Sequence, residues 1–184
     1  MLNLNFIPFP VLRTERLVLR ELNMQDDNEM FFLRSDDKVN QYIDRPKVTV
    51  IEETHAFISK ISNGIANNEW IFWAIELKNS DKLIGTICLW NISKEEASAE
   101  IGFELHPEQQ GKGIMQEATA KVIEFGFSVM QLRKIDAWIN KENLSSIKLI
   151  GKFNFKRDTD LENKFIGMPE LENMVIYSLS NPTT

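Results

Sequence analysis

Three amphipathic segments open the chain. Residues 14–22 (TERLVLREL) alternate leucines with charged side chains, which is the period-two pattern of a half-buried strand. Residues 23–37 predict a helix, because an asparagine can cap its start and two aspartates follow in the first turn, where the helix dipole favours them. A second helix is predicted in residues 49–68, with Thr49 and Glu52 as its capping box.

Strand patterns then follow one another closely. Residues 70–77 (WIFWAIEL) and 82–92 (KLIGTICLWNI) flank a short polar turn, which predicts a hairpin. In residues 98–105 (SAEIGFEL), three large apolar side chains alternate with a glycine and two glutamates. This alternation predicts a third strand with one apolar face and one polar face.

The second half of the chain mixes helices with strands. A helix is predicted from about residue 114 to 130, and a shorter helix over residues 143–153 (NLSSIKLIGKF). Strands are predicted at residues 134–140 (KIDAWIN), near residues 154–158, and at residues 173–179 (NMVIYSL). The order of these elements indicates an α/β protein built on one sheet.

Composition limits the class of protein. A chain of 184 residues with 43% apolar and 26% charged residues fits one globular domain, residues 1–184, with a core from about 12 to 179. Acidic residues outnumber basic ones by 27 to 21, so the net charge is −6. This balance argues against nucleic acid as the partner and is compatible with a cationic or amine-bearing substrate.

Several kinds of site and location are not expected. Cys88 is the only cysteine, so no disulfide framework exists. His55 and His106 stand far apart and beside no cysteine cluster, and we expect no metal site. The N-terminal sequence lacks a signal-peptide pattern and no apolar stretch reaches membrane-spanning length, so we expect a cytoplasmic protein without membrane contact.

A glycine-rich turn precedes the helix at residue 114. In HPEQQGKGIMQEA, residues 106–118, Gly111 and Gly113 flank Lys112 at the point where the helix begins. The free N–H groups of a helix N-terminus attract anions, and glycine lets the backbone approach a ligand closely. Lysine can add a point charge for phosphate. The alternative is a solvated turn that only joins a strand to a helix.

The turn does not match two common nucleotide-binding motifs. The dinucleotide fingerprint needs a third glycine where Gln116 stands, and the P-loop needs GKS or GKT after a longer loop. The remaining pattern, Gln110-x-x-Gly113-x-Met115, resembles the acetyl-CoA pyrophosphate loop of the GNAT superfamily of N-acetyltransferases. Met115 departs from the Gly or Ala usual at the last position, but its backbone N–H can still serve.

Two further segments carry the same resemblance. Residues 14–22 look like the first strand of the ribosomal-protein N-terminal acetyltransferase branch. Residues 143–155 resemble the superfamily's Asn-x-x-Ser/Ala…Gly-Phe segment, with Asn154 in place of the usual glycine. The three matches lie in the expected order and cover most of the chain between Arg16 and Phe155.

The resemblance implies a fold and a cofactor site. The GNAT fold is an α/β fold with a mostly antiparallel mixed sheet, splayed between its fourth and fifth strands and flanked by helices. Acetyl-CoA would lie in this gap, held by the backbone of Phe103 and Leu105 and by Asn143. The loop residues implied to bind its pyrophosphate are Gln110, Gly111, Lys112, Gly113, Ile114 and Met115.

The resemblance also implies catalytic candidates. Glu100 and Glu104 face one side of their strand, and either can take the proton of the attacking amine directly or through water. The alternative for each is a solvated glutamate, and we favour Glu100 because the related branch often has Glu there. The usual acid, a tyrosine, is absent because its position holds Ile150. Ser146 is the remaining candidate acid; alternatively it only satisfies the helix start behind an Asn143 N-cap.

The expected function is transfer of an acetyl group from acetyl-CoA to an amine, with a protein N-terminal α-amine as the first choice. A polyamine, an antibiotic or another small amine also fits. A third alternative is a GNAT-fold sensor that binds acyl-CoA without turnover, which the missing tyrosine and Met115 favour. The sequence does not distinguish a monomer from a homodimer.

Overall fold

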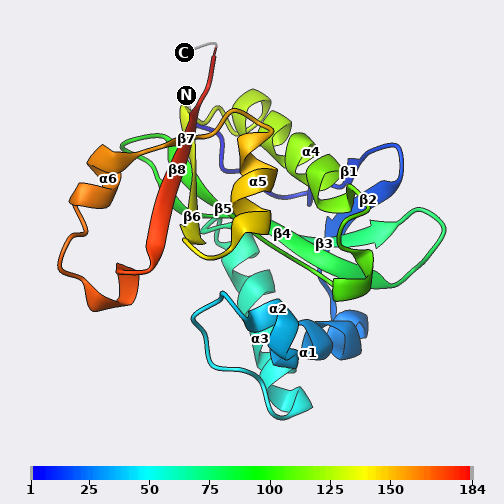
Figure 1. Ribbon diagram of the computed structural model, residues 1–184. Helices are drawn as coiled ribbons and strands as arrows, with labels where there is room; N and C mark the ends of the chain where they lie inside the picture. The colour runs from blue at the N-terminus through cyan, green and yellow to red at the C-terminus, as the bar shows by residue number, and fades with distance from the viewer. Residues whose placement is uncertain (1, 183–184) are drawn as a thin grey trace.

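The structure of the protein, a computed structural model that describes residues 2–182, contains one sheet of eight strands between two helical layers (Figure 1). The strand order across the sheet is β1-β2-β3-β4-β5-β6-β8-β7. The strands are β1 (Leu12–Arg13), β2 (Leu17–Glu21), β3 (Ile71–Leu77), β4 (Leu83–Ser93), β5 (Ser98–Leu105), β6 (Lys134–Asn140), β7 (Lys156–Arg157) and β8 (Met174–Ser180). The α-helices are α1 (Asp27–Ser35), α2 (Asp37–Asn40), α3 (Ile51–Ala66), α4 (Ile114–Ser128), α5 (Leu144–Gly151) and α6 (Thr159–Asn163).

The sheet is mostly antiparallel and parts near its middle. Only β5 and β6 pair in parallel, and they pair only from Ser98 to Glu100 on β5 and from Lys134 to Asp136 on β6. Both strands continue beyond these residues, β5 to Leu105 and β6 to Asn140. When the two-residue edge strand β1 is left out of the count, β5 and β6 are the fourth and fifth strands, and the expected splay is confirmed.

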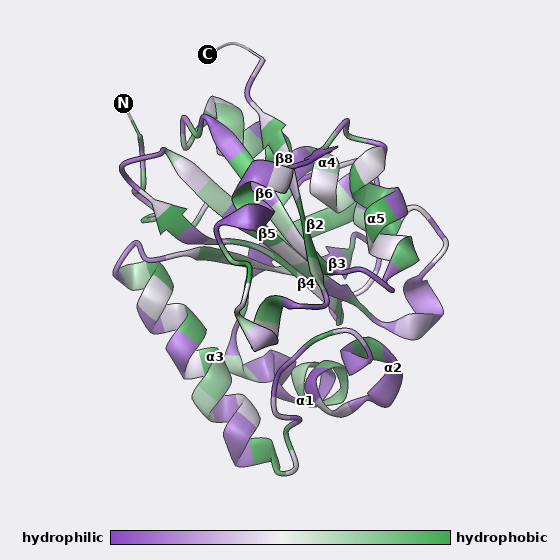
Figure 2. Ribbon diagram, turned by 60° about the vertical axis from the view of Figure 1, so that its left-hand side comes forward, coloured by the Kyte–Doolittle hydropathy of each residue, from purple (hydrophilic) through white to green (hydrophobic). Residues whose placement is uncertain are grey.

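Each face of the sheet packs against its own helices. On one face Trp73 of β3 makes an edge-to-face contact with Phe125 of α4, with ring centroids 5.3 Å apart. On the other face its neighbour Phe72 contacts Phe57 of α3 in the same way, at 5.9 Å. Figure 2 shows hydrophobic colour along the central strands, while α3 alternates between hydrophobic and hydrophilic residues along its length. The α4–α5 layer and the α1–α3 layer therefore bury opposite faces of one hydrophobic sheet.

The alternation of β5 follows from this arrangement. Ile101 pairs with Leu89 of β4, and Leu89 lies at the contact between the sheet and Gly126 of α4. Side chains on one strand alternate between faces, so Glu100 and Glu104 point to the opposite side of the sheet, toward the layer of α1–α3. The predicted apolar and polar faces of this strand are both present.

Local details differ from the sequence-based expectations. Helix α3 is capped by Glu53 rather than Glu52, because Glu53 accepts hydrogen bonds from the backbone N–H groups of Thr49 and Val50, at 2.7 and 3.4 Å. The hydrophobic core also extends before residue 12, since Phe6 is only 1% exposed.

Within residues 2–182, no helix combines the length and the apolar character needed to cross a membrane.

Candidate active site

The glycine turn forms an open loop at the start of α4. Gly111 and Gly113 both have left-handed backbones, with φ of +74° and +76°, and Gly113 is the N-cap of α4. A Cβ at Gly111 would meet nothing within 4 Å, and one at Gly113 would meet only Arg16 Nη2, at 3.5 Å. The protein therefore leaves open space around the loop, next to the free N–H groups of a helix N-terminus. Such a space suits a phosphate group. The loop residues thus fit the pyrophosphate of acetyl-CoA.

Ile114 and Met115 contribute only backbone to this loop. Their side chains are 3% and 8% exposed and belong to the hydrophobic core. The Met115 side chain, which departs from the usual small residue, therefore points into the core and leaves its N–H at the helix start. Gln110 closes the loop against β5, because its side-chain amide donates to the carbonyl of Leu105 at 3.2 Å. Lys112 is exposed, and its Nζ contacts Gln109 Oε1 at 3.3 Å.

An arginine from the start of β2 holds the loop in place. Arg16 Nη1 donates to the carbonyl of Lys112 at 2.9 Å, and its Nε donates to Glu117 Oε2 at 2.6 Å. The hydroxyl of Thr14 donates to the other oxygen of Glu117 at 2.5 Å. Because C=O and N–H point in opposite directions across a trans peptide, binding of the Lys112 carbonyl fixes where the N–H of Gly113 points.

Sequence reasoning missed this arrangement. The ion pair of Arg16 and Glu117 offsets a carboxylate in the first turn of α4, where it would otherwise repel an incoming phosphate. Thr14 and Arg16 lie in the TERL motif and Glu117 in the QEA motif, both already noted for their resemblance. Only the fold brings together residues about a hundred positions apart.

Glu100 lies at the last paired position before β5 and β6 diverge. It is partly buried, and its Oε2 accepts a hydrogen bond from Asn91 Nδ2 at 3.0 Å. Burial raises the pKa of Glu100 to about 7, and the negative charge of Asp136 adds to the rise, while the hydrogen bonds of Asn91 and Trp90 oppose it. A carboxyl with this pKa changes its protonation near neutral pH, as a general base must.

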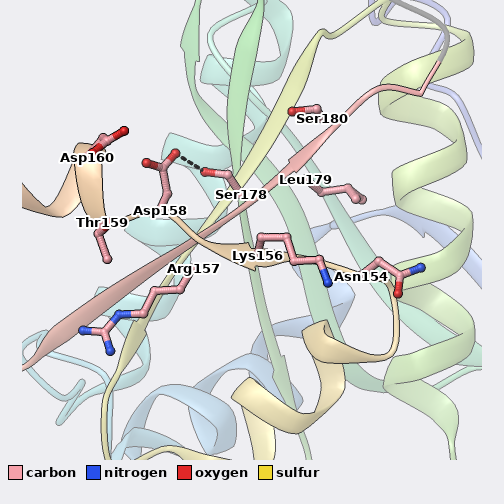
Figure 3. Close-up of a pocket in the computed structure, with 9 residues that line it drawn as sticks. All are labelled: Asn154, Lys156, Arg157, Asp158, Thr159, Asp160, Ser178, Leu179 and Ser180. Atoms are coloured by element: carbon pink, nitrogen blue, oxygen red, sulfur yellow. Dashed lines mark hydrogen bonds between the residues drawn. The ribbon is translucent and has the colours of Figure 1, made fainter.

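Asp136 is the residue of β6 opposite Glu100, and it belongs to a polar network. Its Oδ1 lies 2.5 Å from the hydroxyl of Ser178, and its Oδ2 lies 3.2 Å from Lys134 Nζ. The same hydroxyl contacts Asp158 Oδ2 at 2.8 Å, in the shallow pocket between β7 and β8 (Figure 3). These contacts hold Asp136, only 7% exposed, beside Glu100.

Glu104, the second candidate base, is engaged in a buried ion pair. Its side chain is 6% exposed, its Oε2 lies 2.6 Å from Arg45 Nη2, and its Oε1 accepts from the Thr86 hydroxyl at 3.2 Å. The alternative of a solvated glutamate is therefore wrong for this residue. Both oxygens are occupied, and accepting a proton from a substrate would cost the ion pair. The geometry favours Glu100.

Asn143 and Ser146 meet at the start of α5. Asn143 is the N-cap, since its Oδ1 accepts from the backbone N–H of Ser146 at 3.1 Å and from the Ser145 hydroxyl at 2.9 Å. The capping interpretation of Asn143 is confirmed. Both Asn143 and Ser146 are partly exposed, so their side chains are accessible to a ligand.

Among the described residues, no group of three or more His, Cys, Asp or Glu side chains is arranged to hold a metal ion.

The loop geometry predicts which loop residue matters most for cofactor affinity. Gly113→Val should weaken acetyl-CoA binding at least about tenfold, because a β-branched residue resists the left-handed backbone and crowds the loop. Lys112→Ala should cost less, because it removes one exposed charge and leaves the N–H groups in place. Calorimetric titration with acetyl-CoA measures both. Gln131→Val is the control for backbone strain, since Gln131 also has a positive φ, of 62°, but lies at the far end of α4. Loss of affinity in Lys112→Ala with full affinity in Gly113→Val would contradict the loop account.

The charge of Asp136 should control the protonation of Glu100. Asp136→Asn keeps a polar side chain of the same size but removes the negative charge, so the pKa of Glu100 should fall below its present value of about 7. A ¹³C NMR titration of the Glu100 side-chain carboxyl gives this pKa directly. Asp158→Asn is the matched control, because Asp158 contacts the same Ser178 hydroxyl but is not the β6 partner of Glu100. Equal titration curves in the wild type and Asp136→Asn would show that this charge has no such effect.

Comparison with known proteins agrees with this geometry. Residues 16–156 match the family model described as the acetyltransferase (GNAT) domain. Uncharacterized N-acetyltransferase YoaA of Bacillus subtilis (strain 168) is 32% identical over 176 residues, which are 95% of this chain and 98% of that protein. Spermidine N(1)-acetyltransferase of Escherichia coli (strain K12) is 29% identical over 91 residues, 50% of this chain and 49% of that protein.

Solved structures share the whole fold. The ribosomal-protein-S5-alanine acetyltransferase from Vibrio fischeri has a TM-score of 0.74 at 21% identity, over 94% of this chain and 97% of that chain. With the family model spanning most of the sequence and YoaA similar over nearly its full length, the chain belongs to the GNAT family of N-acetyltransferases.

Proposed function

We propose that this N-acetyltransferase moves the acetyl group of acetyl-CoA to the α-amine of a protein or peptide N-terminus, with Glu100 as general base. The observation that carries the proposal is the position and pKa of Glu100. It stands where β5 and β6 part, and its pKa of about 7 lies close to that of an α-amine, about 7.7–8.0. The ammonium of lysine or of a polyamine has a pKa of about 10.4, so its proton would pass to Glu100 less readily.

The chemistry requires a neutral amine. At neutral pH much of an α-amine is protonated and cannot attack a thioester carbonyl. Glu100 would accept the proton that the amine must lose, and its raised pKa makes it a stronger base than an ordinary glutamate. Asn91, which donates to Glu100 Oε2, would hold the carboxylate in a fixed orientation. Ser146 is the proposed acid that assists departure of the thiol, since it lies at the start of α5 on a partly exposed surface.

The residues that would hold acetyl-CoA lie on three elements. The loop from Gln110 to Met115 would bind the pyrophosphate through backbone N–H groups, with Arg16 fixing the loop. The edge of β5 at Phe103 and Leu105 would face the pantetheine arm, because β6 no longer pairs there. Asn143 would lie at the far side of the gap. Bound acetyl-CoA supplies the acetyl group as an activated thioester.

A polyamine acceptor is the second candidate. Its support is the similarity to spermidine N(1)-acetyltransferase over half of the chain, together with the net charge of −6, which suits a polycation. It predicts strong turnover of spermidine and weak turnover of peptides. Binding of acyl-CoA without turnover is the remaining alternative, and it predicts no thiol release with any amine.

Substitution of Glu100 tests the proposed base. Glu100→Gln keeps the shape and accepts hydrogen bonds but cannot take a proton, so turnover near neutral pH should fall by about 10²-fold or more. The wild-type rate should rise with pH through about 7, as Glu100 loses its proton, and the deficit of the variant should shrink as pH approaches the pKa of the amine. Ser146→Ala should also slow turnover, with less relief at high pH. Thiol release from acetyl-CoA, followed with peptide and spermidine acceptors, measures each rate.

The control for this experiment is Glu95→Gln, which changes the same side chain at an exposed position of the turn after β4. It should leave the rate unchanged. Acetyl-CoA affinity should stay the same in all three variants, which separates chemistry from binding. If Glu100→Gln turns over peptides at the wild-type rate, Glu100 is not the base. If spermidine is acetylated and peptides are not, the proposed acceptor is wrong.

A further inference from the structure

A cavity of about 560 Å³ lies between β6, β8 and the segment that joins β7 to β8. In Figure 1 this segment, which includes α6, projects from the end of the sheet on the side of β8 away from α5. The wall of the cavity combines apolar residues with the polar side chains of Arg157, Glu162, Asn163 and Glu172. Its apolar residues are Trp138, Phe165, Ile166, Met168, Pro169, Leu171, Met174 and Ile176.

Strand register connects this cavity to the proposed base. Trp138 stands two residues beyond Asp136 on β6, so both side chains point to the same face of the sheet. Asp136 is the partner of Glu100, and that face is the one opposite α4. Two residues of strand correspond to about 6.6 Å along β6, and Glu100 lies about 4.8 Å away on the neighbouring strand, so the backbones of Trp138 and Glu100 are at least about 8 Å apart. An amine beside Glu100 would carry its neighbouring atoms toward this wall.

The cavity offers apolar surface to a ligand. Trp138 and Phe165 meet edge to face with ring centroids 4.8 Å apart. Ile166 is 78% exposed and Met168 is 43% exposed, although both line the cavity. Exposed apolar side chains gathered around a hollow are typical of a binding site and unfavourable in water otherwise.

Of the charged residues described around the cavity, Arg157 and Glu162 pair with each other, and Glu172 is exposed. Arg157 contacts both oxygens of Glu162, at 3.0 and 3.1 Å, and Glu162 also accepts from the backbone N–H of Ile176 at 2.8 Å. The Glu162 carboxylate is therefore compensated by a cation and a hydrogen bond. This part of the wall suits an apolar group better than a second ammonium.

We propose that this cavity receives the side chain of the first residue of the acceptor peptide, and that the enzyme therefore prefers N-termini with a large apolar or aromatic first residue. The inference rests on the proposed function, because it assumes an α-amine at Glu100. The inference adds a claim about the first residue of the acceptor that the proposed function does not make. Alanine or serine at the N-terminus would leave the cavity empty. The added contacts would raise kcat/KM at least about tenfold, as a few methylene groups in an apolar pocket do.

The test is a set of peptides that differ only in their first residue. Leucine, phenylalanine, alanine and serine at this position give α-amines of similar basicity, so differences in kcat/KM report on the side chain. Leucine and phenylalanine peptides should exceed alanine and serine peptides at least about tenfold. Equal values across the set would overturn the inference and leave the proposed function standing. Absence of turnover with every peptide would overturn both, as would turnover of free apolar amines such as phenethylamine without any turnover of peptides.

A surface variant checks that the preference comes from this cavity. Ile166→Glu places a charge on its wall at an exposed position where folding tolerates it, so it should reduce kcat/KM for the leucine peptide at least about fivefold and leave the alanine peptide unchanged. Val129→Glu is the matched control, since Val129 is 47% exposed at the end of α4 and lies outside the cavity. Equal loss for both peptides, or no loss for either in Ile166→Glu, would contradict the assignment.

Discussion

The end of the pairing between β5 and β6 at Glu100 and Asp136 is the constraint on which the site depends. A continuous sheet would use every backbone N–H and C=O of both strands for its own hydrogen bonds. Because the two strands diverge, the edge of β5 from Ile101 to Leu105 loses its partner and must find another. An extended ligand such as a pantetheine arm can satisfy it. The same divergence places Glu100 at the apex of the gap, where burial holds its pKa near 7.

The position of the glycine loop is related to the same divergence of β5 and β6. Strand β5 leads through Gln110 into the loop, so the anion site stands at one end of the unpaired edge and Glu100 at the other. Arg16 fixes the position of the loop, because it donates hydrogen bonds to both the Lys112 carbonyl and the Glu117 carboxylate. The ion pair contributes little to stability as a surface contact, but it orients backbone and offsets charge where a pyrophosphate would bind. Electrostatics at the two ends therefore have different purposes: attraction of an anion at α4 and acceptance of a proton at Glu100.

Much of the fold could be predicted from local patterns. The alternation of residues 98–105 predicts the two faces of β5, and the positions of Gly111 and Gly113 predict an open turn before α4. What local patterns do not contain is pairing over long distances. The sequence around Glu104 does not indicate that Arg45 would form a buried ion pair with it. The sequence around Asp136 does not indicate that this residue would lie opposite Glu100. The choice between the two glutamates therefore needed the structure.

Amide hydrogen exchange with and without saturating acetyl-CoA tests the central claim most directly, because it reports on each backbone N–H along the gap. The account predicts that the cofactor protects N–H groups of the loop from Gly111 to Met115 and of the β5 edge from Ile101 to Leu105. Protection should be far weaker in β3, which pairs with β2 on one side and with β4 on the other. Binding that leaves both the loop and the β5 edge unchanged, or that protects a different part of the molecule, would contradict the account.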